Sequence, residues 1–184
     1  MARISLDPPK TLTTRIVQWF SRRRFGTELE PGLAMSHHPK VLRTYARMEM
    51  SAEKWSAVSQ ELKQLAVMAA AATVGCEWCM DFGYWVGITE GIDPPKVRDL
   101  SRWRVSTVYS DLERAVIEYA EAASSTPIAV SDDLVARLRD QLRDDQLVEL
   151  TMMIAIENER ARFNASLGLA SQGFKDRCEI PTAR

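Results

Sequence analysis

The sequence predicts an all-α fold in a single domain. Of its 184 residues 46% are hydrophobic, and Gly and Pro number only eight each. From Val41 onward, Ala, Leu, Glu, Arg and Met dominate and apolar residues recur with helical spacing. Alternation typical of a strand never exceeds four residues. The length suits one domain with enough apolar material for a core.

The expected helices follow one another along the chain. Residues 11–24 form a short amphipathic stretch, after which Gly26 and the pair Pro31–Gly32 break the pattern. Further helices are expected after Pro39, over residues 57–74 and 76–90, from Pro94, over residues 111–124 and 131–142, and from Asp144 to about Leu169.

Capping residues set the expected boundaries of these helices. Gly75 interrupts one helix, and Gly91 fits the C-terminal cap of the next. Asp93 then fits an N-cap with a proline in the first helical position. Ser110 and Glu113 have the spacing of a capping box.

The charges suggest a chain in three parts. Residues 1–54 carry 10 Lys and Arg against 5 Asp and Glu, whereas the remainder carries 14 against 20. We expect a basic N-terminal arm with a short amphipathic helix at 1–36, a helical domain at 37–172 and a C-terminal tail at 173–184. Because the basic excess is confined to the arm, no nucleic-acid partner is expected.

Composition also bears on location and cofactors. The longest nearly apolar run, residues 65–76, is far shorter than the roughly 20 residues of a membrane-spanning helix. The N-terminus lacks a secretory pattern, so we expect a cytoplasmic protein without a transmembrane segment. The two histidines, His37 and His38, are adjacent and there are three cysteines, which excludes a three-His or four-Cys zinc site. Two Cys with two His would have the wrong spacing for a zinc finger, and we expect no metal or other cofactor.

The sequence Cys76-Glu77-Trp78-Cys79 carries the most obvious chemistry. At the head of a helix, a spacing of three residues places both sulfurs on one face, about one turn apart. The helix N-terminus favours a thiolate at the first cysteine, and two thiols so close form a disulfide once one is oxidised. The same pattern also occurs as half of a metal site or as two small buried hydrophobes.

From about His38 to Leu169 the chain resembles the carboxymuconolactone decarboxylase and alkylhydroperoxidase D-like family. The matching stretches, in order, are His38-Pro39 with Leu42, Glu61-Leu62 to Gly75 and the cysteine pair, Trp103-Arg104, Leu112-Glu113-Arg114-Ala115, Leu147-Val148-Glu149-Leu150-Thr151, Asn158 and Phe163-Asn164. The resemblance implies an all-α bundle on a helical hairpin that assembles into homo-oligomers. The family's decarboxylases lack the cysteine pair, so Cys76 and Cys79 indicate the peroxidase-like branch.

By this resemblance the protein is a thiol-dependent peroxidase that reduces small or organic hydroperoxides. The resemblance implies that Cys79 attacks the peroxide oxygen and becomes a sulfenic acid. Cys76 would then resolve it as a disulfide, and an external thiol or protein donor would restore the two thiols.

The chain departs from the peroxidase pattern at Gln64 and Gly83. The family's peroxidases have a Glu twelve residues before the first cysteine and a His four residues after the second, and these form a proton relay. Gln takes up no proton at neutral pH, and Gly has no side chain. General acid–base help is typically worth about 10²–10⁴-fold, so its loss without a replacement would leave a slow peroxidase or none.

Glu61 is the first candidate to replace the relay, because it lies one turn before Gln64 on the same helical face. Glu157, in the last helix, is a second, and Tyr84, five residues beyond Cys79, could donate a hydrogen bond, although a Tyr in an aromatic-rich stretch more often packs. Asp81 is two residues from Cys79 and is expected to be a solvated charge pointing away from the sulfur.

Two other functions stay open. A helical oligomer that has lost peroxidase chemistry would act as a binding protein or a slow redox sensor, and Gln64 and Gly83 favour it. Lactone or decarboxylase chemistry is the third hypothesis, against which the two cysteines argue.

Overall fold

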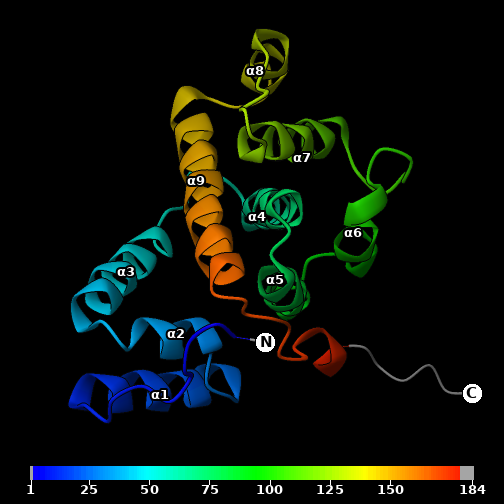
Figure 1. Cartoon of the computed structure of the whole chain (residues 1–184). Helices are drawn as coiled ribbons and strands as arrows, with labels where there is room; N and C mark the ends of the chain where they lie inside the picture. The colour runs from blue at the N-terminus through cyan, green and yellow to red at the C-terminus, as the bar shows by residue number, and fades with distance from the viewer. Residues whose placement is uncertain (1, 179–184) are drawn as a thin grey trace, which may run out of the picture. The chain divides into compact units, whose positions relative to one another are not determined.

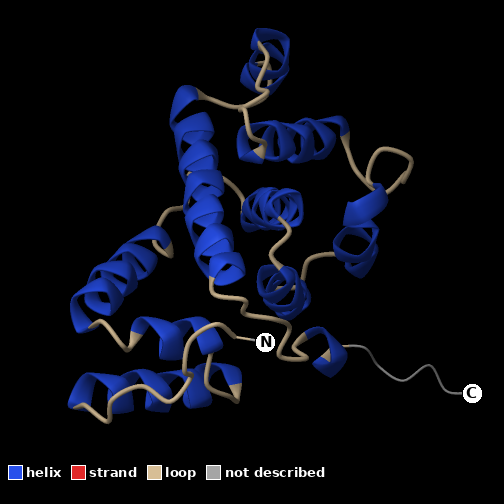
Figure 2. Cartoon of the chain, viewed as in Figure 1, coloured by secondary structure: helices blue, strands red, loops and turns tan. Residues whose placement is uncertain are grey.

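The computed structural model describes residues 2–178, and all regular structure in this range is helical (Figures 1 and 2). The predicted all-α fold is therefore confirmed. No helix in the described range is both long and apolar enough to cross a bilayer. The elements are α1 (Leu12–Phe25), α2 (Glu30–Met35), α3 (Pro39–Ala52), α4 (Gln60–Val74), α5 (Glu77–Thr89), α6 (Pro94–Arg98), η1 (Asp99–Arg102), α7 (Asp111–Ser124), α8 (Asp132–Arg139), α9 (Asp144–Ser166) and η2 (Lys175–Arg177).

Capping interactions explain most helix boundaries. The predicted capping box of α7 is present: the Ser110 hydroxyl accepts from the Glu113 N–H at 3.3 Å, and the Glu113 carboxylate accepts from the Ser110 N–H at 2.7 Å. Helix α4 ends at Gly75, whose φ of 80° side-chain-bearing residues rarely adopt. It begins at Gln60 rather than at residue 57, because the Ser59 side chain accepts from the third N–H of the helix.

Helix α2 was missed from the sequence, where its proline and glycine were interpreted as a break. Pro31 lies in the first turn of α2. There its fixed φ suits a helix, and its missing N–H would have no partner within the helix. Proline therefore helps to begin this helix instead of preventing it.

The chain divides into two compact units, and the division differs from the expected one. Unit 1 comprises Met1–Trp55 with Ser166–Leu169, and unit 2 comprises Ser56–Ala165 with Ala170–Arg184. Helix α3, which we expected in the main domain, belongs to unit 1 because it packs on α2. Residues 173–178 of the expected tail belong to unit 2, and residues 179–184 lie outside the described range.

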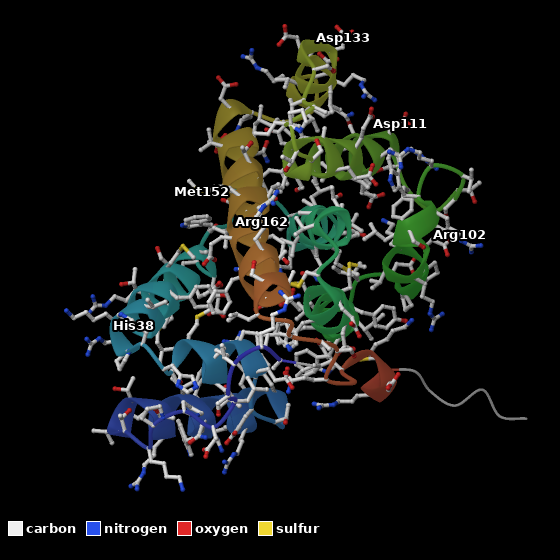
Figure 3. The ribbon with its side chains drawn as sticks, in the orientation of Figure 1. His38, Arg102, Asp111, Asp133, Met152 and Arg162 are labelled. Atoms are coloured by element: carbon white, nitrogen blue, oxygen red, sulfur yellow. A yellow bond between two sulfur atoms is a disulfide. The ribbon has the colours of Figure 1, made fainter. Side chains whose placement is uncertain are left out.

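Unit 1 holds the basic arm. The Arg3 N–H donates to the Leu167 carbonyl at 2.7 Å, which pairs the segment before α1 with the residues that follow α9. His38, labelled in Figure 3, is the N-cap of α3, and its Nδ1 accepts from the Val41 N–H at 3.4 Å. One of the two histidines therefore has a structural role at a helix start.

Unit 2 is built around α4. Its buried face carries Leu65, Met68 and a run of alanines, whose small side chains let neighbouring helices approach closely. Helices α5 and α7 both pack on α4 and lie on opposite sides of it in Figure 1. Long α9 supplies Leu150 and Ile154 to the same core, whereas Met152, labelled in Figure 3, is exposed. Burying an aliphatic side chain of this kind contributes about 1.5–3 kcal/mol.

Candidate active site

The cysteine pair lies where α4 ends and α5 begins. The Cys76 N–H donates to the Ala71 carbonyl at 3.0 Å, which completes the C-terminal cap of α4 together with Gly75. Cys76 is also the N-cap of α5, and its sulfur accepts from the Cys79 N–H at 3.1 Å. The sequence therefore places one sulfur at the N-terminus of a helix, on a first-turn N–H, where negative charge is stabilised.

Cys76 and Cys79 form a disulfide, with their Cα atoms 5.2 Å apart. Both are buried, but Cys79 is the more accessible, at 7% exposed against 1% for Cys76. The third cysteine, Cys178, is free and partly buried, and burial raises the pKa of its thiol. The two cysteines singled out by the sequence are thus close enough to form a disulfide with each other.

Asn164, near the end of α9, faces the cysteine pair. Its Nδ2 donates to the Cys79 sulfur at 3.4 Å, and its side chain is only 2% exposed. The sequence places Asn164 in the family-like pattern but gives no sign of this contact, because 85 residues separate the two positions. The contact becomes visible only in the fold.

The two positions of the missing relay are packed against each other. The Gln64 Nε2 donates to the Gly83 carbonyl at 2.8 Å in a buried hydrogen bond. A Cβ added to Gly83 would lie 3.2 Å from the Met68 Cγ and 3.5 Å from the Gln64 Nε2. A side chain at position 83 would therefore meet the Gln64 amide and the Met68 side chain.

Glu61 and Glu157, the candidate replacements, both hold ion pairs. The Lys96 Nζ donates to the Glu61 carboxylate at 2.8 Å and also bonds to Glu113. Burial would lower the pKa of Lys96, but its hydrogen bonds to the two carboxylates raise it overall. Glu157 is buried and pairs with Arg160 at 3.2 Å. A relay role for Glu61, whose side chain is 40% exposed, stays a prediction.

Asp81 is not a solvated charge, and this expectation was wrong. It is buried, and its carboxylate accepts backbone N–H groups of Gln172, Phe174 and Lys175 at 2.8–3.0 Å. We call residues 170–178 the C-terminal strap. Burial alone would raise the pKa of Asp81, but these hydrogen bonds outweigh burial and lower it. The spacing rule correctly turned Asp81 away from Cys79, but no pattern in the sequence showed that a later segment binds there.

Aromatic side chains fix the C-terminal strap on α5. Phe174 is fully buried, with ring centroids 5.1 Å from Phe82 and 5.7 Å from Trp85. The Trp78 indole stacks on Phe82 at 4.9 Å, and its Nε1 donates to the Gln172 side chain at 2.8 Å. Trp78, between the two cysteines in sequence, is thus held by the strap.

Comparison with known proteins assigns the family. Residues 39–122 match the model of the Carboxymuconolactone decarboxylase family. The uncharacterized protein YnjA of Escherichia coli (strain K12) is 32% identical over 174 residues, which cover 94% of each chain. The uncharacterized protein YdfG of Bacillus subtilis (strain 168) is 25% identical over 116 residues, or 62% of this chain and 79% of YdfG. The chain belongs to the carboxymuconolactone decarboxylase family, as its resemblance to that family implied.

Solved structures share the fold over nearly the whole chain. A cysteine-to-alanine variant of the debrominase Bmp8 in complex with 2,3,4-tribromopyrrole matches with a TM-score of 0.83 and 18% identity, covering 97% of both chains. An uncharacterized peroxidase-related protein from Ralstonia eutropha JMP134, with an alkylhydroperoxidase AhpD core, matches at 0.83 and 15% identity, covering 98% of both. At these identities the likeness establishes the alkylhydroperoxidase D-like fold.

Proposed function

We propose that this protein is a dithiol oxidoreductase that reduces hydroperoxides through Cys79 and Cys76. The observation that carries the proposal is the disulfide at the first turn of α5, within an alkylhydroperoxidase D-like fold. Membership of the family, whose peroxidase-like branch has such a pair, supports it. In a cytoplasmic setting, cellular thiols would keep the pair reduced and ready to react.

In the proposed reaction the Cys79 thiolate attacks the hydroxyl oxygen of a hydroperoxide. An S–O bond forms, the O–O bond breaks, and the alkoxide takes a proton from solvent and leaves as the alcohol. The Cys76 thiolate then displaces the hydroxyl group of the sulfenic acid, which leaves with a proton as water, and the disulfide forms. Two electrons thus pass from the two thiols to the peroxide, and an external thiol or protein donor reduces the disulfide.

The surroundings of the two sulfurs support this division of roles. Cys79 is the less buried cysteine and has a side-chain donor, Asn164, against its sulfur. Cys76 has its sulfur on the N-terminal turn of α5, which favours the thiolate that resolves the intermediate. With Gln64 and Gly83 in place of the relay, we expect a rate about 10²–10⁴-fold below that of a peroxidase with general acid–base help.

Reductive removal of a halogen is a second candidate function. The fold likeness to the debrominase Bmp8 over nearly the whole of both chains favours it. The same pair would supply the two electrons: an aryl bromide and two thiols would give the arene, bromide, a proton and the disulfide. This reaction breaks no O–O bond, so it does not need the proton relay of the peroxidases, whose positions are Gln64 and Gly83 here.

Rapid mixing of the reduced protein with cumene hydroperoxide tests the proposal. We expect the thiols of Cys79 and Cys76 to be consumed faster than those of free dithiothreitol, and Cys79→Ser to abolish the reaction. The matched control, Cys178→Ser, removes the free cysteine and should leave the rate unchanged. Consumption no faster than that of dithiothreitol contradicts the proposal.

Two further arms of the same assay separate the alternatives. Glu61→Gln should lower the peroxide rate about tenfold or more if Glu61 replaces the relay. Glu118→Gln, which breaks an exposed ion pair with Arg137, is its control. Debromination of 2,3,4-tribromopyrrole in place of peroxide reduction would favour the second candidate.

The remaining alternatives are separated by two further outcomes. Inertness to both substrates would favour a binding protein or slow redox sensor. Turnover of a carboxylated lactone by a protein lacking both cysteines would favour decarboxylase-type chemistry.

A further inference from the structure

Asn164 carries an unsatisfied buried acceptor beside the reacting sulfur. Its Nδ2 donates to Cys79, but its Oδ1 has no hydrogen-bond partner. Among the described residues it is the sole buried side-chain nitrogen or oxygen in that condition. Buried polar atoms in native proteins almost always have partners, because an unpaired one lowers stability. Because this unpaired atom lies at the reactive centre, we take its missing partner to be a group of the bound substrate.

The missing partner must be a hydrogen-bond donor. The amide places its two polar atoms on one carbon, so a donor bound to Oδ1 lies close to the sulfur that Nδ2 contacts. A hydroperoxide carries its hydrogen on the oxygen that a thiolate attacks. Donation of that O–H to Oδ1 therefore holds the reacting oxygen beside Cys79.

We propose that Asn164 is a catalytic residue that supports the Cys79 sulfur through Nδ2 and holds the O–H of the hydroperoxide through Oδ1. The inference rests on the proposed function and adds a basis for substrate selection. Asn164 favours substrates that carry a hydrogen-bond donor on the attacked oxygen. The hydrogen bond survives the reaction, because the same oxygen becomes the hydroxyl of the sulfenic acid and still donates to Oδ1.

Two electrophiles separate this role from a general effect on the thiol. Cumene hydroperoxide carries an O–H donor, whereas methyl methanethiosulfonate has no N–H or O–H and reacts with the same thiolate. Single-turnover rates at Cys79, read by peptide mass spectrometry in full-length protein carrying Cys76→Ser, would be measured from pH 6 to 10. The plateau at high pH compares fully formed thiolates, and the midpoint of the profile reports how easily the thiolate forms.

Asn164→Leu removes both polar atoms in a side chain of similar size. Its plateau rate with cumene hydroperoxide should fall about tenfold or more, while the plateau with methyl methanethiosulfonate should stay within about twofold. Asn164→Asp keeps an acceptor but loses the donor. It should keep the wild-type ratio of the two plateau rates while its midpoint moves to higher pH.

The control is Asn158→Leu, on the same helix, where the amide bonds to Ser124 and to the Ile154 carbonyl. It should alter neither the ratio nor the midpoint, and far-UV circular dichroism would verify that every variant is folded. Equal slowing of both electrophiles in Asn164→Leu, or no slowing, overturns the inference and leaves the proposed function standing. A wild-type protein that reacts with cumene hydroperoxide no faster than dithiothreitol overturns both.

Discussion

At the scale of one residue, Gln64 has a role in packing. Its amide donates to the Gly83 carbonyl in a buried hydrogen bond. Glutamate is nearly the same shape, but an ionised carboxylate has no hydrogen to donate. The amide therefore suits a neighbour that offers a carbonyl acceptor and has no side chain of its own.

Gln64→Glu should destabilise the protein by about 1–3 kcal/mol at pH 8, because the carboxylate would face the Gly83 carbonyl. The protonated acid can still donate, so folding would raise the pKa of the introduced carboxyl above its unfolded value. The penalty would then be small below the unfolded pKa and grow as the pH rises through the folded one. Urea unfolding at pH 4.5 and 8 measures it. Gln141→Glu, at an exposed position after α8, is the control, and an equal loss at both pH values would refute the explanation.

The reactive centre could be predicted from the sequence only in part. Cys76 and Cys79 lie three residues apart, so helical geometry alone brings their sulfurs together. Asn164 reaches Cys79 from a different helix, and a lone asparagine carries no local signal of such a contact. Glu61 shares a face with Gln64, but no periodicity could show that Lys96 would bind its carboxylate.

At the scale of elements, α5 is held on one face by the C-terminal strap. Asp81 supplies the polar contacts, accepting three backbone N–H groups of the strap. Phe174 supplies the apolar ones, packed among aromatic side chains of α5. Because Trp78 also bonds to the strap through Gln172, the segment that carries the cysteines and the strap are coupled.

Asp81→Asn should loosen the C-terminal strap by about 1–3 kcal/mol, because the N–H groups bond to both carboxylate oxygens and an amide keeps only one, uncharged, oxygen to accept them. The expected readouts are faster amide exchange at Phe174 and Lys175 and faster tryptic cleavage after Lys175. Glu77→Gln is the control, since Glu77 meets the strap through one longer contact, 3.4 Å from the Ser171 nitrogen. Unchanged exchange in Asp81→Asn would contradict the assigned role.

The pH dependence of the strap follows from the same carboxylate. The pKa of Asp81 is lowered in the folded protein from the ordinary value of 3.8, despite burial, by its hydrogen bonds. Its contribution to stability is therefore complete above the unfolded pKa and is lost as the pH falls through the lower folded pKa. We expect the wild-type strap to loosen only in strong acid, and the difference from Asp81→Asn to vanish there.

Helix boundaries marked by capping residues were the most predictable feature of the elements. The interpretation of proline as a helix breaker was the main source of error. Ser110 and Glu113 satisfy each other locally, so their sequence spacing sufficed to begin α7. Pro31 also acts locally, but a proline is typical both of residues that follow a helix and of the first turn of a helix, and here it lies in a first turn. Whether α2 forms depends on packing against its neighbours α1 and α3, which no short pattern records.

At the scale of the whole molecule, an exposed apolar face of unit 1 bears on assembly. Helix α1 exposes Leu12, Ile16, Trp19 and Phe20 together. Contiguous apolar surface of this kind marks an interaction site. We propose that this face binds a second copy of the chain, in the homo-oligomer that the sequence resemblance led us to expect.

The double variant Ile16→Glu and Trp19→Glu should have a lower molar mass than the wild type by light scattering. Association would bury two charges, and this cost opposes it. Val105→Glu is the control, since Val105 is exposed in unit 2. The inference is refuted if the wild-type protein has the mass of one chain, or if the α1 variant keeps the wild-type mass.

Cys76 lies between α4 and α5 and caps both helices. Its N–H closes α4 on the Ala71 carbonyl, and its sulfur opens α5 on the Cys79 N–H. The residue whose N–H caps the end of α4 therefore also carries the sulfur that caps the start of α5, and only Gly75 and Cys76 lie between the two helices. An insertion between Gly75 and Cys76 would disrupt the capping hydrogen bonds of both helices and displace the cysteine pair. We therefore expect the protein not to tolerate a change of chain length at this junction.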